Sequence, residues 1–140
     1  MKAQLRHVKN YQFTGITDGG HALNFDAYPP VGGEGTAGTP MEVLLLCLAS
    51  CTAMDAVAIL GKKKQKFDNF EVSVESEKAE THPKVFTKIH LNYVFTGENL
   101  VDKAVARSIE LSMEKFCTVS AMLKAGGVEV TYGYEIVGKE

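Results

Sequence analysis

The fold is decided by the stretch TPMEVLLLCLASCTAMDAVAILG, residues 39–61. Its start matches a capping box, in which Thr39 and Glu42 satisfy free backbone donors of a first helical turn. Pro40 suits the first helical position, because its missing N–H would have no partner there. Gly61 can adopt the left-handed conformation that ends many helices, and three lysines follow it near the negative pole. We therefore predict one helix over this stretch, about 30 Å long.

The middle of this helix is apolar on every side, so we expect it to be buried. A membrane-spanning helix is the competing interpretation, because residues 43–60 approach the length that a bilayer requires. Asp55 argues against a membrane span, as does the absence of a second such stretch in the sequence. The pattern thus favours the central helix of a soluble protein without membrane contacts. Two cysteines, Cys47 and Cys51, lie one turn apart on it.

Length and composition limit the possible functions. The 140 residues suit a single domain, residues 1–140, with a sizeable core. A formal net charge of -2 provides no electrostatic footprint for nucleic acid or for an anionic membrane. Three cysteines, an odd number, do not form a secreted disulfide framework, and the sequence opens without an apolar signal segment. We expect a cytoplasmic protein with reduced thiols and no nucleic-acid partner.

The residues before the helix alternate as short strands, which we expect at 3–8, 11–17 and 21–27. Asp18-Gly19-Gly20 is a typical hairpin turn between the last two. Residues 28–38 contain four glycines and two prolines, so we predict a mobile loop there. Such a loop is either a plain connector or a lid over a site.

The residues after the helix alternate between strand and helix patterns, with expected ranges 70–75, 85–95, 99–116, 117–124 and 128–136. Asn99 is the expected cap of the second helix. Cys117 lies at the predicted start of a short third helix, where free backbone N–H groups can stabilise a thiolate. This order predicts an α+β fold, because it lacks the regular alternation of a doubly wound one.

Three features resemble the OsmC/Ohr family, which comprises bacterial thiol peroxidases that act on organic hydroperoxides. They are the Pro40-Met41-Glu42 helix start, Cys51 on the same helix, and Cys117-Thr118-Val119-Ser120 further along the chain. The segments on either side of Cys117, Glu114-Lys115-Phe116 and Ala121-Met122-Leu123, are most similar to the YhfA-like branch of that family. The order of elements extends the resemblance over nearly the whole chain.

The resemblance implies an OsmC-like fold: antiparallel sheets around a long buried central helix, with a second cysteine-bearing helix. It also implies an intertwined homodimer whose two active sites draw on both chains. In the implied chemistry, Cys51 attacks an organic hydroperoxide and becomes a sulfenic acid, which condenses with Cys117 to a disulfide. A dithiol reductant then restores the thiols, and a lipoyl-type dithiol is one candidate. The chemistry requires the two cysteines to approach to a Cα separation of about 7 Å.

The chain departs from the family at the residues that activate the cysteine. The better-known members carry a glutamate ten positions before the first cysteine, paired with an arginine from the preceding loop. Here Met41 holds that position, and residues 28–38 contain neither arginine nor lysine. Glu42, nine positions before Cys51, lies about 180° away around the helix, so we expect it to act only as a cap. Arg107 is a candidate replacement cation, with a solvated helix position as the alternative.

Two functions therefore remain open. The retained Cys51 and Cys117 favour a thiol peroxidase, whereas the missing arginine and shifted glutamate favour a non-enzymatic stress or ligand-binding protein of the same fold. Cys47 is expected to pack in the core. The four histidines have no ligand spacing, so neither a metal site nor another cofactor is expected. The rate of hydroperoxide consumption in the presence of a dithiol separates the two functions.

Overall fold

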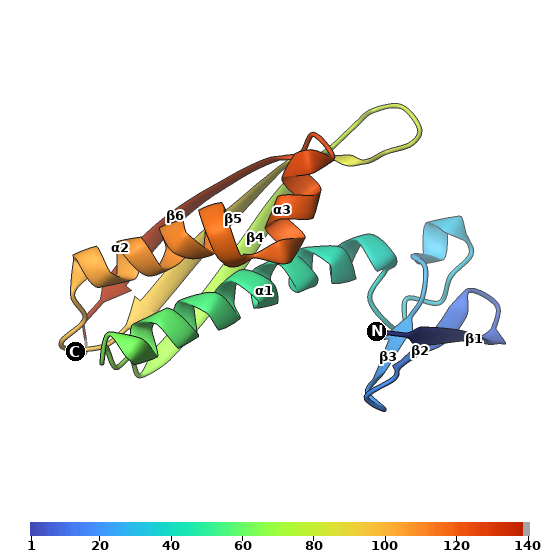
Figure 1. The fold of residues 1–140 in the computed structure, drawn as a ribbon. Helices are drawn as coiled ribbons and strands as arrows, with labels where there is room; N and C mark the ends of the chain where they lie inside the picture. The colour runs from blue at the N-terminus through green and yellow to red at the C-terminus, as the bar shows by residue number, and fades with distance from the viewer. Residues whose placement is uncertain (139–140) are drawn as a thin grey trace. The chain divides into compact units, whose positions relative to one another are not determined.

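The computed structural model describes residues 1–138. The chain forms two compact units, one spanning Met1–Leu45 and one that begins at Leu46, and each is described by itself. That the two form a single domain stays a prediction. The elements, drawn in Figure 1, are β1 Ala3–Lys9, β2 Gln12–Thr17, β3 Ala22–Phe25, η1 Pro29–Val31, α1 Pro40–Lys62, β4 Asn69–Lys78, β5 Phe86–Thr96, α2 Asp102–Leu111, η2 Ser112–Phe116, α3 Thr118–Ala125 and β6 Glu129–Val137.

The first unit contains a three-stranded antiparallel sheet in the order β1-β2-β3. The predicted hairpin between β2 and β3 is confirmed. Its turn is closed by the amide of Thr17, which donates to the carbonyl of His21 over 3.0 Å. Gly20 has a φ of 83° in this turn, a conformation that glycine adopts without steric cost.

The loop between β3 and α1 is organised around Asp26, which is only 3% exposed. The Asp26 carboxylate accepts hydrogen bonds from the Thr36 amide (3.0 Å), the Thr36 hydroxyl (2.7 Å) and the Ala27 amide (2.7 Å). The bonds from Thr36 lower the pKa of Asp26 to about 2. The loop also contains the short 3₁₀ helix η1. The expectation of an irregular loop therefore missed both a helical turn and a buried carboxylate anchor.

The predicted capping box at the start of α1 is confirmed. The Thr39 amide donates to Glu42 Oε2 over 2.7 Å, and the Glu42 amide donates to Thr39 Oγ1 over 3.3 Å. The Tyr28 hydroxyl donates to the other Glu42 oxygen over 2.5 Å. Glu42 is therefore held at the helix start, as expected from its angular position.

The predicted end of α1 at Gly61 is wrong, because the helix continues to Lys62. The residue in the left-handed conformation is Lys64, with a φ of 55°. The Lys64 amide donates to Gly61 O (3.0 Å) and the Gln65 amide donates to Leu60 O (2.9 Å), which is the hydrogen-bond pair of a Schellman motif. Gly61 thus supplies a carbonyl to the motif, and a lysine holds the position where glycine is usual.

Lys64→Gly should therefore stabilise the protein by about 1 kcal/mol, because a side chain at this φ costs about 1–2 kcal/mol. Lys62→Gly, two residues earlier and still helical, is the matched control and should cost about 1 kcal/mol. Urea unfolding of both variants measures the difference. Equal destabilisation by both would contradict the strain assigned to Lys64.

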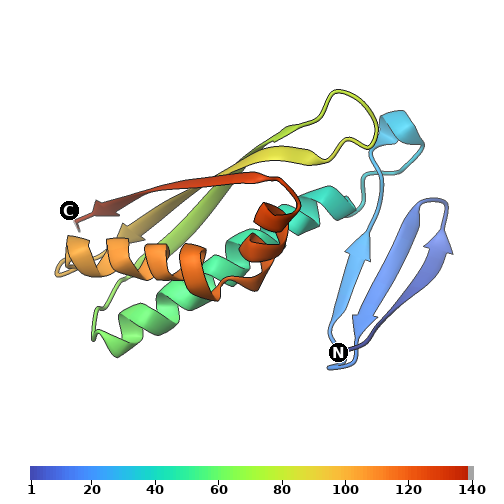
Figure 2. The same cartoon turned by 45° about the horizontal axis from the view of Figure 1, so that its top comes forward.

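The second unit contains a three-stranded sheet in the order β4-β5-β6, and the helices cover one face of it (Figures 1 and 2). β4 and β5 are antiparallel, as expected, but β5 and β6 are parallel. The expectation of antiparallel sheets was thus wrong for this last pair. The reason is the connection: α2, η2 and α3 cross over between β5 and β6, which is how parallel neighbours are joined.

The core lies between this sheet and the helices. Along β5 the residues that alternate toward the helices are fully buried, namely Ile89, Leu91, Tyr93 and Phe95. α1 contributes Leu48, Ala56 and Leu60 to the same core, and α2 contributes Val105 and Ile109.

The prediction that Asn99 caps α2 is wrong, because α2 begins at Asp102 with Val101 at the cap position. There the Val101 amide donates instead to the side chain of Gln65, over 2.8 Å.

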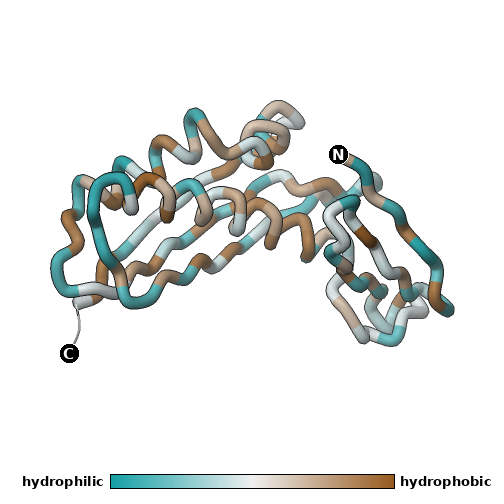
Figure 3. The backbone as a smooth tube through the Cα atoms, turned by 60° about the horizontal axis from the view of Figure 1, so that its bottom comes forward, coloured by the Kyte–Doolittle hydropathy of each residue, from teal (hydrophilic) through white to brown (hydrophobic). Residues whose placement is uncertain are grey.

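Several large apolar side chains of α1 are exposed. Apolar residues run along the helix (Figure 3), yet Leu46, Met54 and Val57 are 65%, 69% and 44% exposed. The single chain thus leaves part of this apolar helix exposed, and its burial by a second copy stays a prediction. By length and composition α1 could cross a membrane, the one such helix among residues 1–138, but core helices of soluble proteins meet the same criterion.

Candidate functional site

Cys51 and Cys117 meet although 66 positions separate them in the sequence. Both are free thiols, and the Cys51 side chain lies near enough to Cys117 to raise the pKa of its thiol. Cys51 lies on α1 and is partly exposed, whereas Cys117 lies between η2 and α3 and is 3% exposed. This interaction supports the predicted approach of the two cysteines, while their Cα separation and their catalytic roles stay predictions.

Cys117 is placed by the turn before it and the helix after it. η2 is a π-helical turn, and the Cys117 amide donates to the carbonyl of its first residue, Ser112, over 2.8 Å. Such turns inside helices often occur at functional sites. Cys117 then caps α3, where its sulfur accepts a hydrogen bond from the Ser120 amide over 3.3 Å. The predicted backbone donor at the start of this helix is therefore present.

The electrostatics of the pair favour different roles for the two thiols. The pKa of the Cys117 thiol is raised to about 11, mainly by burial and also by the Cys51 side chain and the Asp55 charge, against the lowering effect of the Ser120 amide. Cys117 is therefore protonated at neutral pH and poorly suited to a first attack on a substrate. Cys51, which is more exposed, is the better placed of the two for that attack.

Asp55 is a carboxylate beside the thiols that sequence reasoning did not assign to the site. It lies one turn after Cys51 on α1, and its Oδ2 accepts a hydrogen bond from the Ser112 hydroxyl over 2.8 Å. The sequence signal was present, because Asp55 is an acidic residue in an otherwise apolar run, four positions after a cysteine. In the sequence analysis Asp55 was used only as an argument against a membrane-spanning helix.

A second buried polar pair supports the site from the sheet. The Tyr93 hydroxyl and Thr52 Oγ1 are 2.5 Å apart, and both residues are fully buried. Burial raises the pKa of Tyr93 to about 12, so the phenol is neutral at physiological pH. The pair joins β5 to α1 next to Cys51, and so fixes the helix turn that carries the thiol.

Tyr93→Phe should lower the free energy of unfolding by about 1–3 kcal/mol, because it leaves the buried Thr52 hydroxyl without this partner. Adding Thr52→Val should cost less than it does in the wild-type background, because the orphaned group is then removed. Urea unfolding of the two single variants and the double variant measures the coupling. Strictly additive effects would contradict a hydrogen bond between these side chains.

The candidate cation from the sequence does not reach the thiols. Arg107 pairs with Glu110 on the exposed side of α2, so the solvated position is the correct alternative. Cys47 was expected to pack in the core, but it is exposed in this chain. Among residues 1–138, no group of three or more His, Cys, Asp or Glu side chains is arranged to hold a metal ion.

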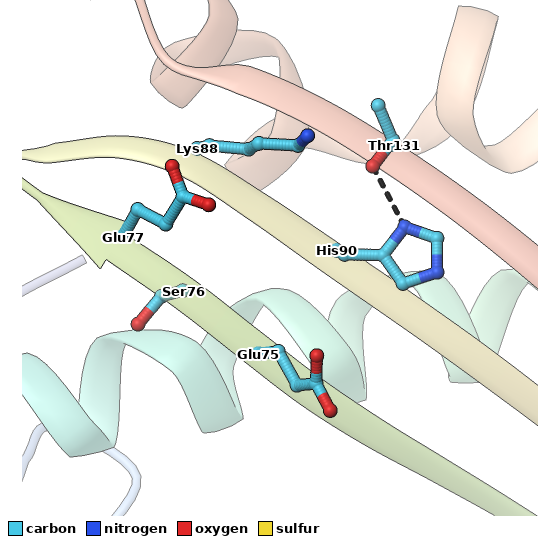
Figure 4. A pocket seen from close by; sticks show the side chains of 6 residues that line it. All are labelled: Glu75, Ser76, Glu77, Lys88, His90 and Thr131. Atoms are coloured by element: carbon cyan, nitrogen blue, oxygen red, sulfur yellow. Dashed lines mark hydrogen bonds between the residues drawn. The ribbon is translucent and has the colours of Figure 1, made fainter.

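A hollow of about 290 Å³ lies on the other face of the sheet, lined by Glu75, Ser76, Glu77, Lys88, His90 and Thr131. Figure 4 shows these side chains on the strands, with the helices behind the sheet. His90 Nδ1 is 2.7 Å from Thr131 Oγ1. On β5, Lys88 and His90 alternate with the buried core residues, so this hollow lies on the opposite face of the sheet from the core.

Comparison with known proteins supports the fold. A family model described as an OsmC-like protein matches residues 33–133. Protein YhfA of Escherichia coli strain K12 is 39% identical over 138 residues, which is 98% of each chain. A crystal structure of a hypothetical protein from Aquifex aeolicus VF5 has a TM-score of 0.85 and 29% identity, covering 99% of this chain and 97% of the other.

A more distant neighbour carries a functional name. The organic hydroperoxide resistance protein OsmC from Legionella pneumophila has a TM-score of 0.72 and 18% identity, covering 96% of this chain and 95% of its own. At this identity the likeness concerns the fold.

Proposed function

Because the chain belongs to the OsmC-like protein family, we propose that it is a cytoplasmic thiol peroxidase that reduces organic hydroperoxides. The observation that supports this most strongly is that the Cys51 side chain lies near enough to Cys117 to raise the pKa of its thiol. Two free thiols from distant segments, one partly exposed and one buried, are the minimum that a peroxidase with an intramolecular disulfide requires.

In the proposed cycle the Cys51 thiolate attacks the terminal peroxide oxygen, so that the O–O bond breaks and an alkoxide leaves, which takes up a proton from water to become the alcohol. Cys51 becomes a sulfenic acid, and the Cys117 thiol displaces its hydroxyl as water to form a disulfide. An external dithiol, for which a lipoyl-type dithiol is a candidate, attacks the disulfide and restores both thiols. No metal or organic cofactor takes part in these steps.

The proposed assembly is an intertwined homodimer. The exposed stripe of α1, defined by Leu46, Met54 and Val57, is apolar surface that a second copy would cover. Two-fold dimers are the commonest oligomers. Each active site would then lie near residues of both chains.

A non-enzymatic ligand-binding or stress protein of the same fold is the second candidate. It is favoured by the position of Glu42 in the helix cap and by the pairing of Arg107 with Glu110, since neither residue activates Cys51. The test is the consumption of tert-butyl hydroperoxide by reduced protein with excess dihydrolipoamide. Multiple turnovers that disappear in Cys51→Ser support the peroxidase, whereas a wild-type rate equal to that of Cys51→Ser overturns it.

A further inference from the structure

We propose that the Asp55 carboxylate, held in place by the Ser112 hydroxyl, accepts the proton of the Cys117 thiol as Cys117 attacks the sulfur of Cys51. This inference rests on the dithiol cycle proposed above. It assigns a role to the acidic residue that lies one turn after Cys51 on α1.

Ser112 connects the two groups directly. Its hydroxyl donates to Asp55 Oδ2 over 2.8 Å, and its carbonyl accepts the amide of Cys117 over 2.8 Å. Ser112 is fully buried and Asp55 is partly exposed, so this bridge between α1 and the π-helical turn is partly shielded from solvent. The Asp55 charge is close enough to act on the Cys117 thiol, and on Tyr93 beside it. The geometry thus links a fixed carboxylate to the backbone of the buried cysteine through a single residue, Ser112.

The Cys117 thiol needs a group that accepts its proton. Its thiol is buried and protonated at neutral pH, and only a thiolate attacks sulfur efficiently. A thiolate formed by losing the proton to water would stand beside a charged Asp55, and the two negative charges would repel each other. Passing the proton to Asp55 removes that repulsion, because the pair then carries a single charge throughout. General bases placed in this way contribute about 10²–10⁴-fold to a rate.

The step balances within the site. As the S–S bond forms, the S–H bond of Cys117 and the S–O bond of the Cys51 sulfenic acid break. The proton of the thiol goes to Asp55, and the leaving hydroxide takes up that proton and departs as water. The oxidation comes entirely from the hydroperoxide of the preceding step. When the disulfide is later reduced, the same carboxylic acid can return a proton to the departing Cys117 sulfur.

An aromatic disulfide tests this step without any hydroperoxide. In a Cys47→Ser background only Cys51 and Cys117 remain, because the sequence has three cysteines. Dithiobis(nitrobenzoate) should label Cys51 and release one coloured thiolate. Attack by Cys117 should then release a second, and form the Cys51–Cys117 disulfide. Stopped-flow absorbance resolves the two phases.

Asp55→Asn is the decisive variant, because Asn has the same size and can still accept the Ser112 hydrogen bond. It should not slow the first phase, but it should slow the second about 10²-fold at pH 7. If Asp55 acted only through its charge, the same change would lower the pKa of Cys117 and speed the second phase. An unchanged or faster second phase would therefore overturn the proposal.

The pH profile gives a readout that a structural role would not produce. The groups acting on Cys117 are Cys51 and Asp55 from α1, with Tyr93 close by on β5, and Tyr93 stays neutral with a pKa of about 12. In Asp55→Asn the second-phase rate should rise about tenfold per pH unit from pH 7 to 9, because solvent must then remove the proton. With Asp55 present the rise should be shallower, and equal slopes would contradict the proposal.

Ser112→Ala keeps the carboxylate but removes its hydrogen bond, so its second phase should lie between the other two. It also provides a second variant if Asp55→Asn folds poorly. A parent protein that releases only one coloured thiolate per chain would overturn the disulfide, and this inference with it. If the parent completes both phases but consumes no hydroperoxide, only the proposed peroxidase fails.

Discussion

Reduced Cys117→Ser protein should consume about one equivalent of organic hydroperoxide per chain and then stop, whereas Cys51→Ser should consume none. The difference follows from the proposed roles, because attack on the peroxide needs only the first thiol and recycling needs both. In Cys117→Ser the product should be a Cys51 sulfenic acid, which dimedone traps with a characteristic mass. Wild-type protein with excess dithiol should continue over many equivalents.

The same two variants also test the opposite assignment, in which Cys117 attacks the peroxide and Cys51 forms the disulfide with it. If Cys117 were the attacking residue, Cys51→Ser would consume one equivalent, and dimedone would label Cys117. The raised pKa of the Cys117 thiol, about 11, and its 3% exposure argue against that assignment. Cys47→Ser should behave like the wild type, because Cys47 is exposed and no role in the cycle is assigned to it. Equal residual turnover in Cys51→Ser and Cys117→Ser would show that neither thiol has its proposed role.

The parts of the fold that the sequence predicted are those set by local patterns. The capping box of Thr39 and Glu42, the hairpin turn at Gly20 and the strand alternation of β5 depend on neighbouring residues, so periodicity and capping rules were sufficient. The errors involve distant partners. Asn99 was expected to cap α2, but the helix starts after Val101, whose amide donates to Gln65, 36 positions before it.

In the candidate site, too, the features set by local sequence were predicted and those set by distant contacts were not. Cys51 and Cys117 were found through a family resemblance, and the helix-start position of Cys117 through local sequence. Asp55 and Ser112 were missed, because their meeting depends on how the π-helical turn packs against α1. A turn of this kind has no simple sequence signal: residues 99–116 read as one continuous helix, whereas the structure divides them at Ser112.

The last prediction is that a charge on the exposed side of α1 changes the mass of the protein in solution. Met54→Glu should convert a stable dimer into monomers of 15.2 kDa at micromolar concentration. Met54 is 69% exposed in the single chain, on the same stripe as Leu46 and Val57. If a second chain covers that stripe, a carboxylate there loses its water without gaining a partner, which costs several kcal/mol.

The matched control for that change is Val85→Glu, because Val85 is 52% exposed and lies in the loop between β4 and β5. It adds the same charge away from α1 and should leave the dimer intact. Sedimentation equilibrium of all three proteins measures the masses, and an obligate interface should bury more than about 2,000 Å² in total. A folded wild-type monomer would contradict the proposed assembly. A Met54→Glu variant that stays dimeric would place the interface elsewhere, and would leave the exposed apolar side of α1 without the partner that its composition requires.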